Sequence, residues 1–323
     1  MVLTEAAELT ATQMKKCSLD EIKVKVFAVS EQSIYDGPGN RMVIFFQGCN
    51  VGCSWCHSPH SQPYKSPLLF YSDRCILCRR CQTACKNGVH EFIGEEHTLN
   101  RDKCIQCGKC IESCPRSAAN KESGVLYLPT KTLTVSSLMQ QILPYLALCD
   151  GVTVSGGEAL LQTEGCIRFL MECKQRNIHT ALETSGLLPQ SLYSKANPYV
   201  DVWLWGVRVI VDKNRYSDLK IQEENAELLA GRAKEIIPRI TVIPGLITEK
   251  EVLSRTLRIL KALGQNAVWV NPWNKSYDVY YRACGLQPDF PEPSDEDIET
   301  AQSDLLQFLS QNGFKIINQT NLQ

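Results

Sequence analysis

Three groups of closely spaced cysteines carry the chemistry that this sequence predicts. The chain has 323 residues and 16 cysteines, and its first group, Cys49, Cys53 and Cys56, has the spacing C-x3-C-x2-C. A cubane of four irons needs a ligand at each iron, so three thiolates leave one iron without a protein ligand. We expect the reaction to take place at that open iron.

The other two groups repeat a single spacing, C-x2-C-x2-C-x3-C, and Pro115 follows the second run. In bacterial two-cluster ferredoxins, three cysteines of such a run bind one [4Fe-4S] cluster and the fourth binds the other. A structural zinc site is the alternative, since zinc takes four tetrahedral thiolates, but it needs no repeat of this length. The predicted ligand sets are Cys75, Cys78, Cys81 and Cys114 for one auxiliary cluster, and Cys104, Cys107, Cys110 and Cys85 for the other.

The composition narrows the class of protein. An apolar content of 44% in a chain of this length fits one large α/β domain with a small insertion. The formal net charge of -1 favours neither nucleic acid nor a membrane as partner. No apolar run approaches the roughly 18 residues that span a bilayer, and the N-terminus lacks the pattern of a secretory signal.

We therefore expect a cytoplasmic protein. Thiols are kept reduced in the cytoplasm, so closely spaced cysteines there indicate metal ligands rather than disulfides. Iron–sulfur clusters of this kind are oxygen-labile, which points to an anaerobic or microaerobic host.

Short apolar strands that alternate with amphipathic helices must position these cysteines. A polar extension is expected over residues 1–22, and two strands, joined by the turn-rich Tyr35–Gly39, precede the Cys49 loop. The later βα repetition predicts parallel strands with crossover helices, about six units that form a partial or open barrel. The expected strands are Lys23–Ser30, Arg41–Phe46, Gly151–Val154, His179–Leu182, Val200–Ile210, Glu235–Ile243 and Asn266–Val270, and the expected helices are Gln162–Arg176, Ser217–Ala233, Glu249–Leu263 and Ser294–Leu309.

The predicted barrel comprises residues 23–66 and 129–323, and the cysteine-rich insertion comprises residues 67–128. In barrels of this kind the reactive groups lie on loops at the C-terminal ends of the strands. The Cys49 loop, Ser155–Glu158, Glu183–Gly186 and Asn271–Asn274 each directly follow an expected strand. We expect these four loops to meet at one face.

The loop Gly48–His57, GCNVGCSWCH, resembles the C-x3-C-x-aromatic-C loop of the radical S-adenosylmethionine superfamily. Further stretches resemble the glycyl-radical-enzyme activating enzymes, the pyruvate formate-lyase activating enzyme-like family. The resemblance covers roughly residues 30–317, and the double-cluster insertion resembles the longer members of that family. The stretches are Asp36–Gly39 (DGPG), Phe45–Gly48 (FFQG), Ser155–Ala159 (SGGEA) and Arg239–Gly245 (RITVIPG).

The resemblance implies a fold, a reaction and partners. The fold is a partial (β/α)6 barrel with an inserted ferredoxin-like subdomain that holds two of three [4Fe-4S] clusters. S-adenosylmethionine occupies the open iron through its amino and carboxylate groups, and one electron cleaves it to methionine and a 5'-deoxyadenosyl radical. The radical removes a glycine α-hydrogen from a partner glycyl radical enzyme, and a flavodoxin or ferredoxin-type protein supplies the electron.

Residue roles follow from the resemblance by position. Cys49, Cys53 and Cys56 bind the first cluster and are the catalytic centre. Beside the last ligand, Trp55 and His57 line the adenine side of the cofactor. After a later strand, Thr184 and Ser185 reach its ribose or carboxylate.

The turn Gly156-Gly157-Glu158 is expected to hold the methionine part of the cofactor. The two glycines let the backbone approach without a Cβ clash, and Glu158 supports the ammonium group. An ordinary strand-to-helix turn is the alternative interpretation of the same three residues.

Two places depart from the family pattern. Where the activating enzymes carry Asp-x-Lys, this chain has Gly206, Val207 and Arg208, so the carboxylate is missing and the positive charge is a planar guanidinium. The family's histidine maps to Asn274, which can form hydrogen bonds but carries no charge. All four residues are predicted cofactor contacts.

Three functions are compatible with the sequence. The first is activation of a glycyl radical enzyme, the second is radical chemistry on a small molecule or peptide, and the third is non-enzymatic electron transfer. The eight-cysteine insertion alone would fit the third, but an electron carrier needs neither a three-cysteine loop nor a barrel.

Overall fold

A nine-stranded sheet, in the order β15-β14-β13-β10-β9-β8-β2-β1-β7, forms the body of the protein. The computed structural model describes residues 21–119, 124–212 and 215–317, so nearly all of the predicted N-terminal extension lies outside the described residues. From β2 to β15 every neighbouring pair is parallel, whereas β1 runs antiparallel to β2 and β7. The strands of this sheet are β1 (Lys23–Ser33), β2 (Arg41–Phe46), β7 (Lys131–Thr134), β8 (Gly151–Gly156), β9 (Thr180–Thr184), β10 (Val202–Gly206), β13 (Glu235–Thr241), β14 (Ala267–Asn271) and β15 (Lys315–Ile317).

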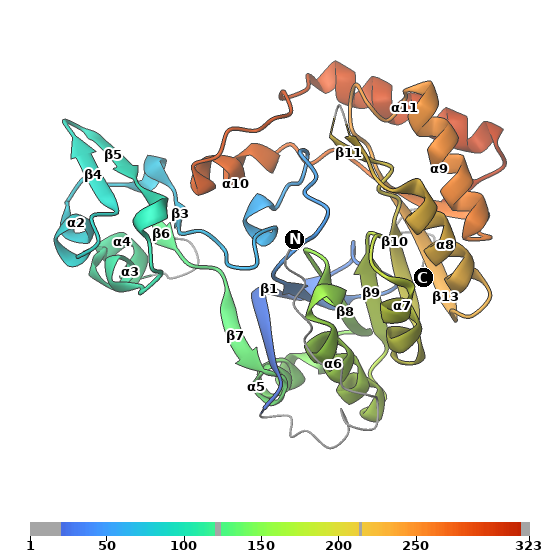
Figure 1. Ribbon diagram of the computed structural model, residues 1–323, viewed down its shortest axis with the longest axis horizontal. Helices are drawn as coiled ribbons and strands as arrows, with labels where there is room; N and C mark the ends of the chain where they lie inside the picture. Colours follow the sequence, from blue (N-terminus) through green and yellow to red (C-terminus); the bar gives the residue numbers. More distant parts are fainter. Residues whose placement is uncertain (1–20, 120–123, 213–214, 318–323) are drawn as a thin grey trace.

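Helices follow the parallel strands in turn and lie on the outer side of the sheet (Figure 1). Local signals in the sequence start several of them, such as the capping box of Ser294 and Asp297 at the beginning of α11. The α/β class with a large parallel sheet is therefore confirmed. The helices outside the insertion are α5 (Val135–Ile142), α6 (Thr163–Gln175), α7 (Gln190–Ala196), α8 (Leu219–Ala230), α9 (Lys250–Ala262), α10 (Tyr277–Cys284) and α11 (Asp295–Gln311).

The central strands are apolar because helices and loops cover them on both faces. All five residues of β10 are buried, and in β2 only Phe45 is partly exposed. Near-continuous apolar runs are typical of parallel strands buried on both sides. This burial holds the C-terminal strand ends, where the Cys49 loop begins, in a rigid frame.

One predicted strand, Val200–Ile210, is wrong in its extent. The strand β10 ends at Gly206, and the next backbone N–H, that of Val207, donates to Arg239 O at 2.9 Å. The chain then leaves the sheet and forms the short hairpin of β11 (Ile210–Asp212) and β12 (Arg215–Tyr216). The apolar residues of this segment, Val207, Val209, Ile210 and Val211, are all buried, and Val211 O accepts a hydrogen bond from Ser54 N at 2.9 Å.

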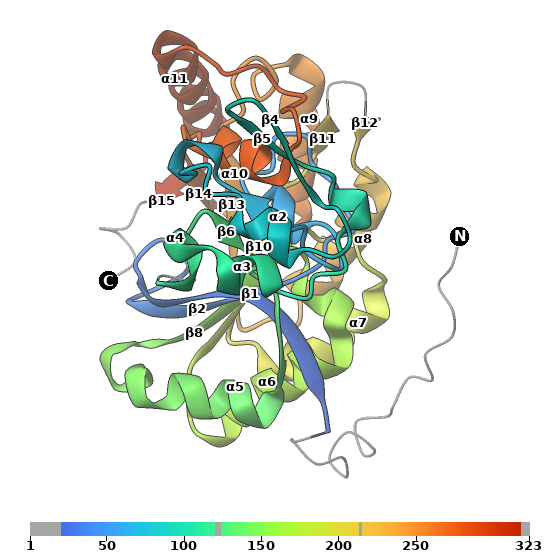
Figure 2. The same ribbon diagram turned by 90° about the vertical axis from the view of Figure 1, so that its left-hand side faces the viewer.

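The cysteine-rich region has a small core of its own. It projects to one side of the body (Figure 1), and Figure 2 shows it from that side. Leu68, Phe70, Ile111, Val125 and Leu126 pack there with three of the cysteines. Its elements are β3 (Leu69–Phe70), α2 (Arg80–Ala84), β4 (His90–Ile93), β5 (Glu96–Leu99), α3 (Lys109–Ser113), α4 (Pro115–Ala118) and β6 (Leu126–Tyr127), with the 3-10 turns η2 (Ser72–Arg74) and η3 (Arg101–Lys103).

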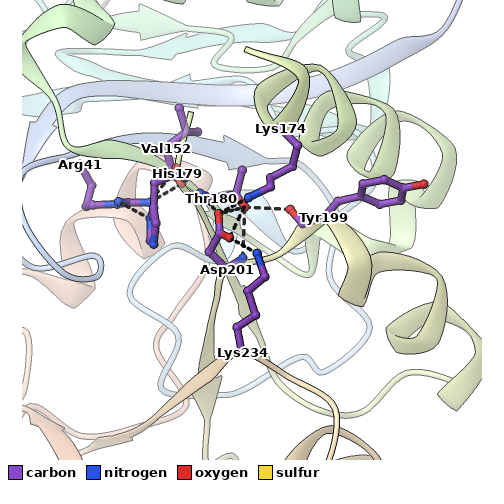
Figure 3. A network of polar contacts seen from close by, with 8 residues as sticks. All are labelled: Arg41, Val152, Lys174, His179, Thr180, Tyr199, Asp201 and Lys234. Atoms are coloured by element: carbon purple, nitrogen blue, oxygen red, sulfur yellow. Dashed lines mark hydrogen bonds and ion pairs between the residues drawn. The ribbon is translucent and has the colours of Figure 1, made fainter. Parts of the chain in front are cut away.

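A polar network ties the strands together at the end opposite the Cys49 loop (Figure 3). Asp201, just before β10, accepts hydrogen bonds from Lys174 at 2.7 Å, from Lys234 at 2.8 Å and from Thr180 N at 3.0 Å. Next to it, the buried Arg41 donates to Val152 O at 2.7 Å. These bonds join α6, β9, β10 and the segment before β13, so they stabilise the sheet at the end away from the cysteine loop.

Within the described residues, every helix is too short or too polar to cross a membrane.

Candidate active site

A cavity of about 290 Å³ lies at the carboxyl ends of the parallel strands. Its wall includes Cys49, Cys53 and Cys56 from the loop after β2. Residues 155–157 at the end of β8, 183–185 at the end of β9 and 271–274 at the end of β14 complete much of the wall. The four loops that the strand pattern predicts to meet at one face therefore do meet.

The surroundings of the three thiols of the Cys49 loop favour thiolates bound to a metal group over free cysteine side chains. Burial raises the pKa of Cys49 to about 11 and that of Cys53 to about 12, and it also raises the pKa of Cys56. Thiolates at this depth need a positive group beside them, and a metal supplies that charge by binding the sulfurs directly. The donor set therefore fits an iron–sulfur cluster.

Hydrogen bonds from several segments hold the Cys49 loop in place. Gln62 accepts from Cys49 N through its carbonyl at 2.9 Å and donates from its side chain to Cys53 O at 3.0 Å. Tyr281 of α10 donates to Ser54 O at 2.7 Å. The spacing of the three thiols is thus set by neighbouring segments as well as by the loop itself.

Gly156 and Gly157 line the cavity and also allow two backbones to touch. Gly156 has φ +114°, and a Cβ there would collide with the backbone of Phe46. A Cβ at Gly157 would collide with Gly48 O and would come within 3.1 Å of Cys49 Cβ. The glycines therefore bring the turn after β8 directly against the cysteine loop, while their contact with a methionine moiety stays a prediction.

Glu158 is buried and its carboxylate points to the neighbouring strand end. It accepts from Thr184 Oγ1 at 3.0 Å, from Ser185 N at 2.8 Å and from Ser185 Oγ at 2.7 Å. Burial raises the pKa of Glu158, and these hydrogen bonds oppose the shift. Thr184 and Ser185 line the cavity whereas Glu158 does not, so in this structure Glu158 orients those two residues.

A charged network forms part of the cavity wall. The carboxylate of Glu183 lies 3.4 Å from Arg239 Nη1 and 3.6 Å from Arg208 Nη2. Burial alone raises the pKa of Glu183, but Arg239 and Arg208 outweigh it and hold the pKa below its ordinary value. Arg239 Nη1 is also 3.9 Å from Asp36 Oδ1.

The arginines of this network can donate further hydrogen bonds to a bound anion. Arg239 is buried, and its Nε and Nη1 have no hydrogen-bond partner among the described residues. Spacing along the sequence assigns no functional role to Arg239, Glu183 or Asp36. The DGPG and RITVIPG stretches contain two of them, and only the fold brings these stretches together.

The departures at 206–208 are explained by packing. The guanidinium of Arg208 lies over the backbone of Gly206, since a Cβ at Gly206 would come within 3.1 Å of Arg208 Cζ. The same guanidinium is 5.3 Å from the ring centre of Trp55. Arg208 lines the cavity, whereas Gly206 and Val207 are not among the residues of its wall, and their contact with a cofactor stays a prediction.

Other predicted cofactor contacts also lie at the cavity. Trp55, His57 and Asn274 line it. Burial lowers the pKa of His57, so its ring is neutral near pH 7. Asn274 Oδ1 accepts from Ser276 N at 2.9 Å, which leaves its amide N–H groups for a ligand.

The insertion gathers its eight cysteines around two smaller cavities. Each cavity is lined by three cysteines of one run and the last cysteine of the other, which is the crossed grouping that the spacing predicts. The assignment of these cysteines as cluster ligands stays a prediction. The sets are Cys75, Cys78, Cys81 and Cys114, and Cys85, Cys104, Cys107 and Cys110.

Two histidines beside the first set were missed by the sequence analysis. His97 Nδ1 lies 3.4 Å from Cys75 Sγ, and His97 Nε2 lies 3.0 Å from His90 Nδ1. Burial lowers the pKa of both rings to about 4, so both are neutral near pH 7. Cys81, His90 and His97 place ligand atoms within 4.8 Å of one another, a grouping that a single metal ion could also use.

Comparison with known proteins places these features in a family. Residues 68–123 match the family model of the 4Fe-4S dicluster domain, which favours iron–sulfur clusters over zinc in the insertion. The choline trimethylamine-lyase activating enzyme of Oleidesulfovibrio alaskensis is 28% identical over 301 residues, which are 88% of this chain and 95% of that one. The isethionate sulfite-lyase activating enzyme of the same organism is 30% identical over 252 residues, 73% of this chain and 79% of that one.

The chain belongs to the glycyl-radical-enzyme activating enzymes. This activating enzyme is a radical S-adenosylmethionine enzyme, of the kind that generates a glycyl radical on a partner enzyme. Among solved structures, QueE from Escherichia coli matches 92% of this chain and 93% of that chain, with a TM-score of 0.48 and 13% identity.

Family membership settles the choice among the three functions. An electron carrier is excluded as the function of the whole chain, because the relatives are enzymes and the match extends over most of the chain. A protein partner is favoured over a small molecule, because activation of another enzyme is what the family does.

Proposed function

We propose that S-adenosylmethionine binds in the 290 Å³ cavity, against a [4Fe-4S] cluster held by Cys49, Cys53 and Cys56. The observation that carries this proposal is that all three thiols and the ends of three further parallel strands line one cavity. When this cluster is bound and reduced, it would supply the electron that splits S-adenosylmethionine into methionine and a 5'-deoxyadenosyl radical.

The residues of the wall bind and orient the cofactor. Arg208 and Arg239 attract its carboxylate, and Thr184 and Ser185, held by Glu158, present hydroxyl groups to its polar end. Trp55 and His57 cover the adenine. The mainly parallel sheet is, in this proposal, a partial (β/α)6 barrel of the radical S-adenosylmethionine type.

The insertion acts as a ferredoxin-like electron relay in this proposal. It holds two further [4Fe-4S] clusters in the crossed cysteine sets, which brings the total to three. A flavodoxin or ferredoxin-type protein delivers the electron to the insertion. A glycine of a partner glycyl radical enzyme enters the cavity and loses its α-hydrogen there.

The decisive test is Cys53→Ala, measured as formation of 5'-deoxyadenosine by anaerobically reconstituted protein with dithionite. We expect the product to disappear, because the first cluster loses one of its three thiolates. Cys149→Ala is the matched control, since Cys149 lies outside the three groups, and it should keep wild-type turnover. Continued cofactor cleavage by Cys53→Ala would refute the assignment of this cavity.

A further inference from the structure

Helix α10 contacts both the Cys49 loop and the insertion. Tyr281 of this helix donates to Ser54 O, inside the loop, at 2.7 Å. Two residues later, Ala283 O accepts from Arg101 Nη2 of the insertion at 2.8 Å. Figure 1 shows α10 between the insertion and the body of the protein. One short helix thus connects the two cysteine-bearing regions.

Arg101 lies in the turn that leads into the second cysteine run. Its carbonyl accepts from Cys104 N at 2.9 Å, so the residue belongs to the turn that presents the first cysteine of that run. Its side chain donates to two carbonyls, Leu68 O at 3.1 Å and Ala283 O at 2.8 Å. Leu68 lies where the chain enters the insertion, so a single guanidinium joins the entry segment, the second run and α10.

The end of α10 is shaped to receive this guanidinium. The last carbonyls of a helix lack partners within the helix and carry partial negative charge, which a cation stabilises. Gly285 ends α10 in the left-handed conformation, with φ +70°. A Cβ on Gly285 would collide with Arg101 Nη1 and come within 2.9 Å of Arg101 Cζ. Glycine therefore serves both the helix end and the close approach of Arg101.

The second run is hydrogen-bonded to the segment that precedes the insertion. Gln106, between Cys104 and Cys107, donates to Ser66 O, and Leu68 lines the cavity of the second run. The cavity of the first run is instead bordered by His97 of the hairpin β4–β5, which lies toward the outer end of the insertion (Figure 1).

We propose that Arg101 and Gly285 lock the second cysteine run to α10. The cluster of that run is then the last electron carrier before the cluster of the Cys49 loop. The first run then receives the electron and the second passes it on. Arg101 is a positioning residue in this scheme, because it acts through α10 and the turn before Cys104. The electron-transfer part rests on the relay role proposed above.

Three substitutions test the lock. Arg101→Ala removes both hydrogen bonds, and Arg101→Lys replaces the planar fork, which reaches the two carbonyls from different nitrogens, with a single nitrogen. Gly285→Asn introduces asparagine, which tolerates the left-handed conformation, but it places a Cβ where the guanidinium lies. Arg258→Ala is the control, since Arg258 is an exposed arginine that joins α9 to Glu223 of α8 and lines none of the three cysteine-bearing cavities.

The readouts are iron content, the electron paramagnetic resonance spectrum of the reduced protein, and the rate at which the Cys49-loop cluster is reduced by flavodoxin hydroquinone. We expect Arg101→Ala and Gly285→Asn to keep the wild-type iron content. Both should lose the magnetic coupling between the second-run cluster and the Cys49-loop cluster, and both should slow the reduction of the Cys49-loop cluster several-fold. Arg101→Lys should lie in between, and Arg258→Ala should match the wild type.

The double substitution Arg101→Ala/Gly285→Asn provides a further check. It should be no slower than either single variant, because the added Cβ has nothing left to displace. Additive effects, or unchanged coupling and rate in Arg101→Ala, would overturn the lock. Unchanged reduction in Cys107→Ala, which removes a ligand of the second cluster, would instead overturn the relay role, so the two failures are distinguishable.

Discussion

At the scale of single residues, the cavity is defined by buried charges whose partners come from distant parts of the chain. Glu183 is held between Arg239 and Arg208, and Ser155 Oγ donates to it at 2.7 Å. Because two arginines share one carboxylate, part of their hydrogen-bonding capacity faces the cavity. An incoming carboxylate can use that capacity.

Arg208→Lys tests this capacity. An ammonium group cannot pair with Glu183 and a ligand carboxylate through the planar fork that a guanidinium offers. We expect binding of S-adenosylmethionine to weaken about tenfold, the effect of losing roughly one charge-assisted hydrogen bond. The measurement is a titration of the cofactor followed by the spectrum of the Cys49-loop cluster.

Gly206→Asp accompanies this test as a second probe of the same site. Its new side chain must push the Arg208 guanidinium away, since that group already lies within 3.1 Å of the Cβ position. If both variants bound the cofactor as the wild type does, Arg208 would not contact it.

At the scale of the elements, the turn after β8 and the loop after β2 pack directly against each other. Gly157 allows the pairing, because any side chain there meets Gly48 O. This steric requirement explains the two consecutive glycines without reference to a ligand.

Gly157→Ala should separate the turn from the Cys49 loop. We expect a loss of about 1–3 kcal/mol in the free energy of unfolding, as in other overpacked sites, and poor assembly of the first cluster. Denaturant unfolding and iron content per chain are the measurements. Gly231→Ala is the control, since a Cβ there meets nothing within 4 Å. Full iron incorporation in Gly157→Ala would show that the loop tolerates the displacement.

The network around Asp201 is a second feature of this scale. Burial alone raises the pKa of Asp201, but hydrogen bonds from Lys174, Lys234 and Thr180 outweigh it and hold the pKa below its ordinary value. The stabilisation is therefore complete above the pKa of an unfolded aspartate, about 4, and is lost as the pH falls through the folded pKa.

Asp201→Asn should lower the free energy of unfolding by about 2 kcal/mol near pH 7, less than for a fully buried pair because Lys234 is largely exposed. Denaturant unfolding of the two proteins at several pH values measures the difference. It should shrink below about pH 4, where the carboxylate of the unfolded wild-type chain takes up a proton while that of the folded protein is still ionised. A difference that stayed constant down to pH 3 would contradict the ionic origin of the stabilisation.

At the scale of the whole molecule, the body and the insertion hold separate cysteine-lined cavities. The body holds the cavity, and the insertion holds eight cysteines in two cavities at its side (Figures 1 and 2). Cys78 and Cys107 are exposed, so each set reaches the surface of the insertion, where an electron donor can approach.

Cys78→Ala and Cys107→Ala should each lower the iron content and slow electron delivery from a protein donor. Neither should affect the binding of S-adenosylmethionine, because both residues lie outside the 290 Å³ cavity. Iron analysis and the cofactor-induced spectral change of the Cys49-loop cluster measure the two effects separately. Loss of cofactor binding in either variant would show that the insertion also shapes the cavity.

The order and spacing of residues along the chain were enough to predict the class of chemistry and most of the strands and helices. Cysteine spacing defines the three-thiol loop and the two repeated runs because ligand geometry restricts spacing so strongly. Apolar periodicity predicts the parallel strands, since burial on both faces demands apolar runs. The same reasoning extended β10 too far, because Val207 and Val209 are buried without being part of a strand.

Which distant residues contact one another became clear only from the folded chain. Glu158 is turned toward Thr184 and Ser185, Arg208 lies over Gly206, and Arg101 reaches the end of α10. Each of these contacts depends on the direction of a side chain between segments far apart in sequence. Spacing along one chain cannot encode such directions, because they arise from how the strands and the insertion pack against one another.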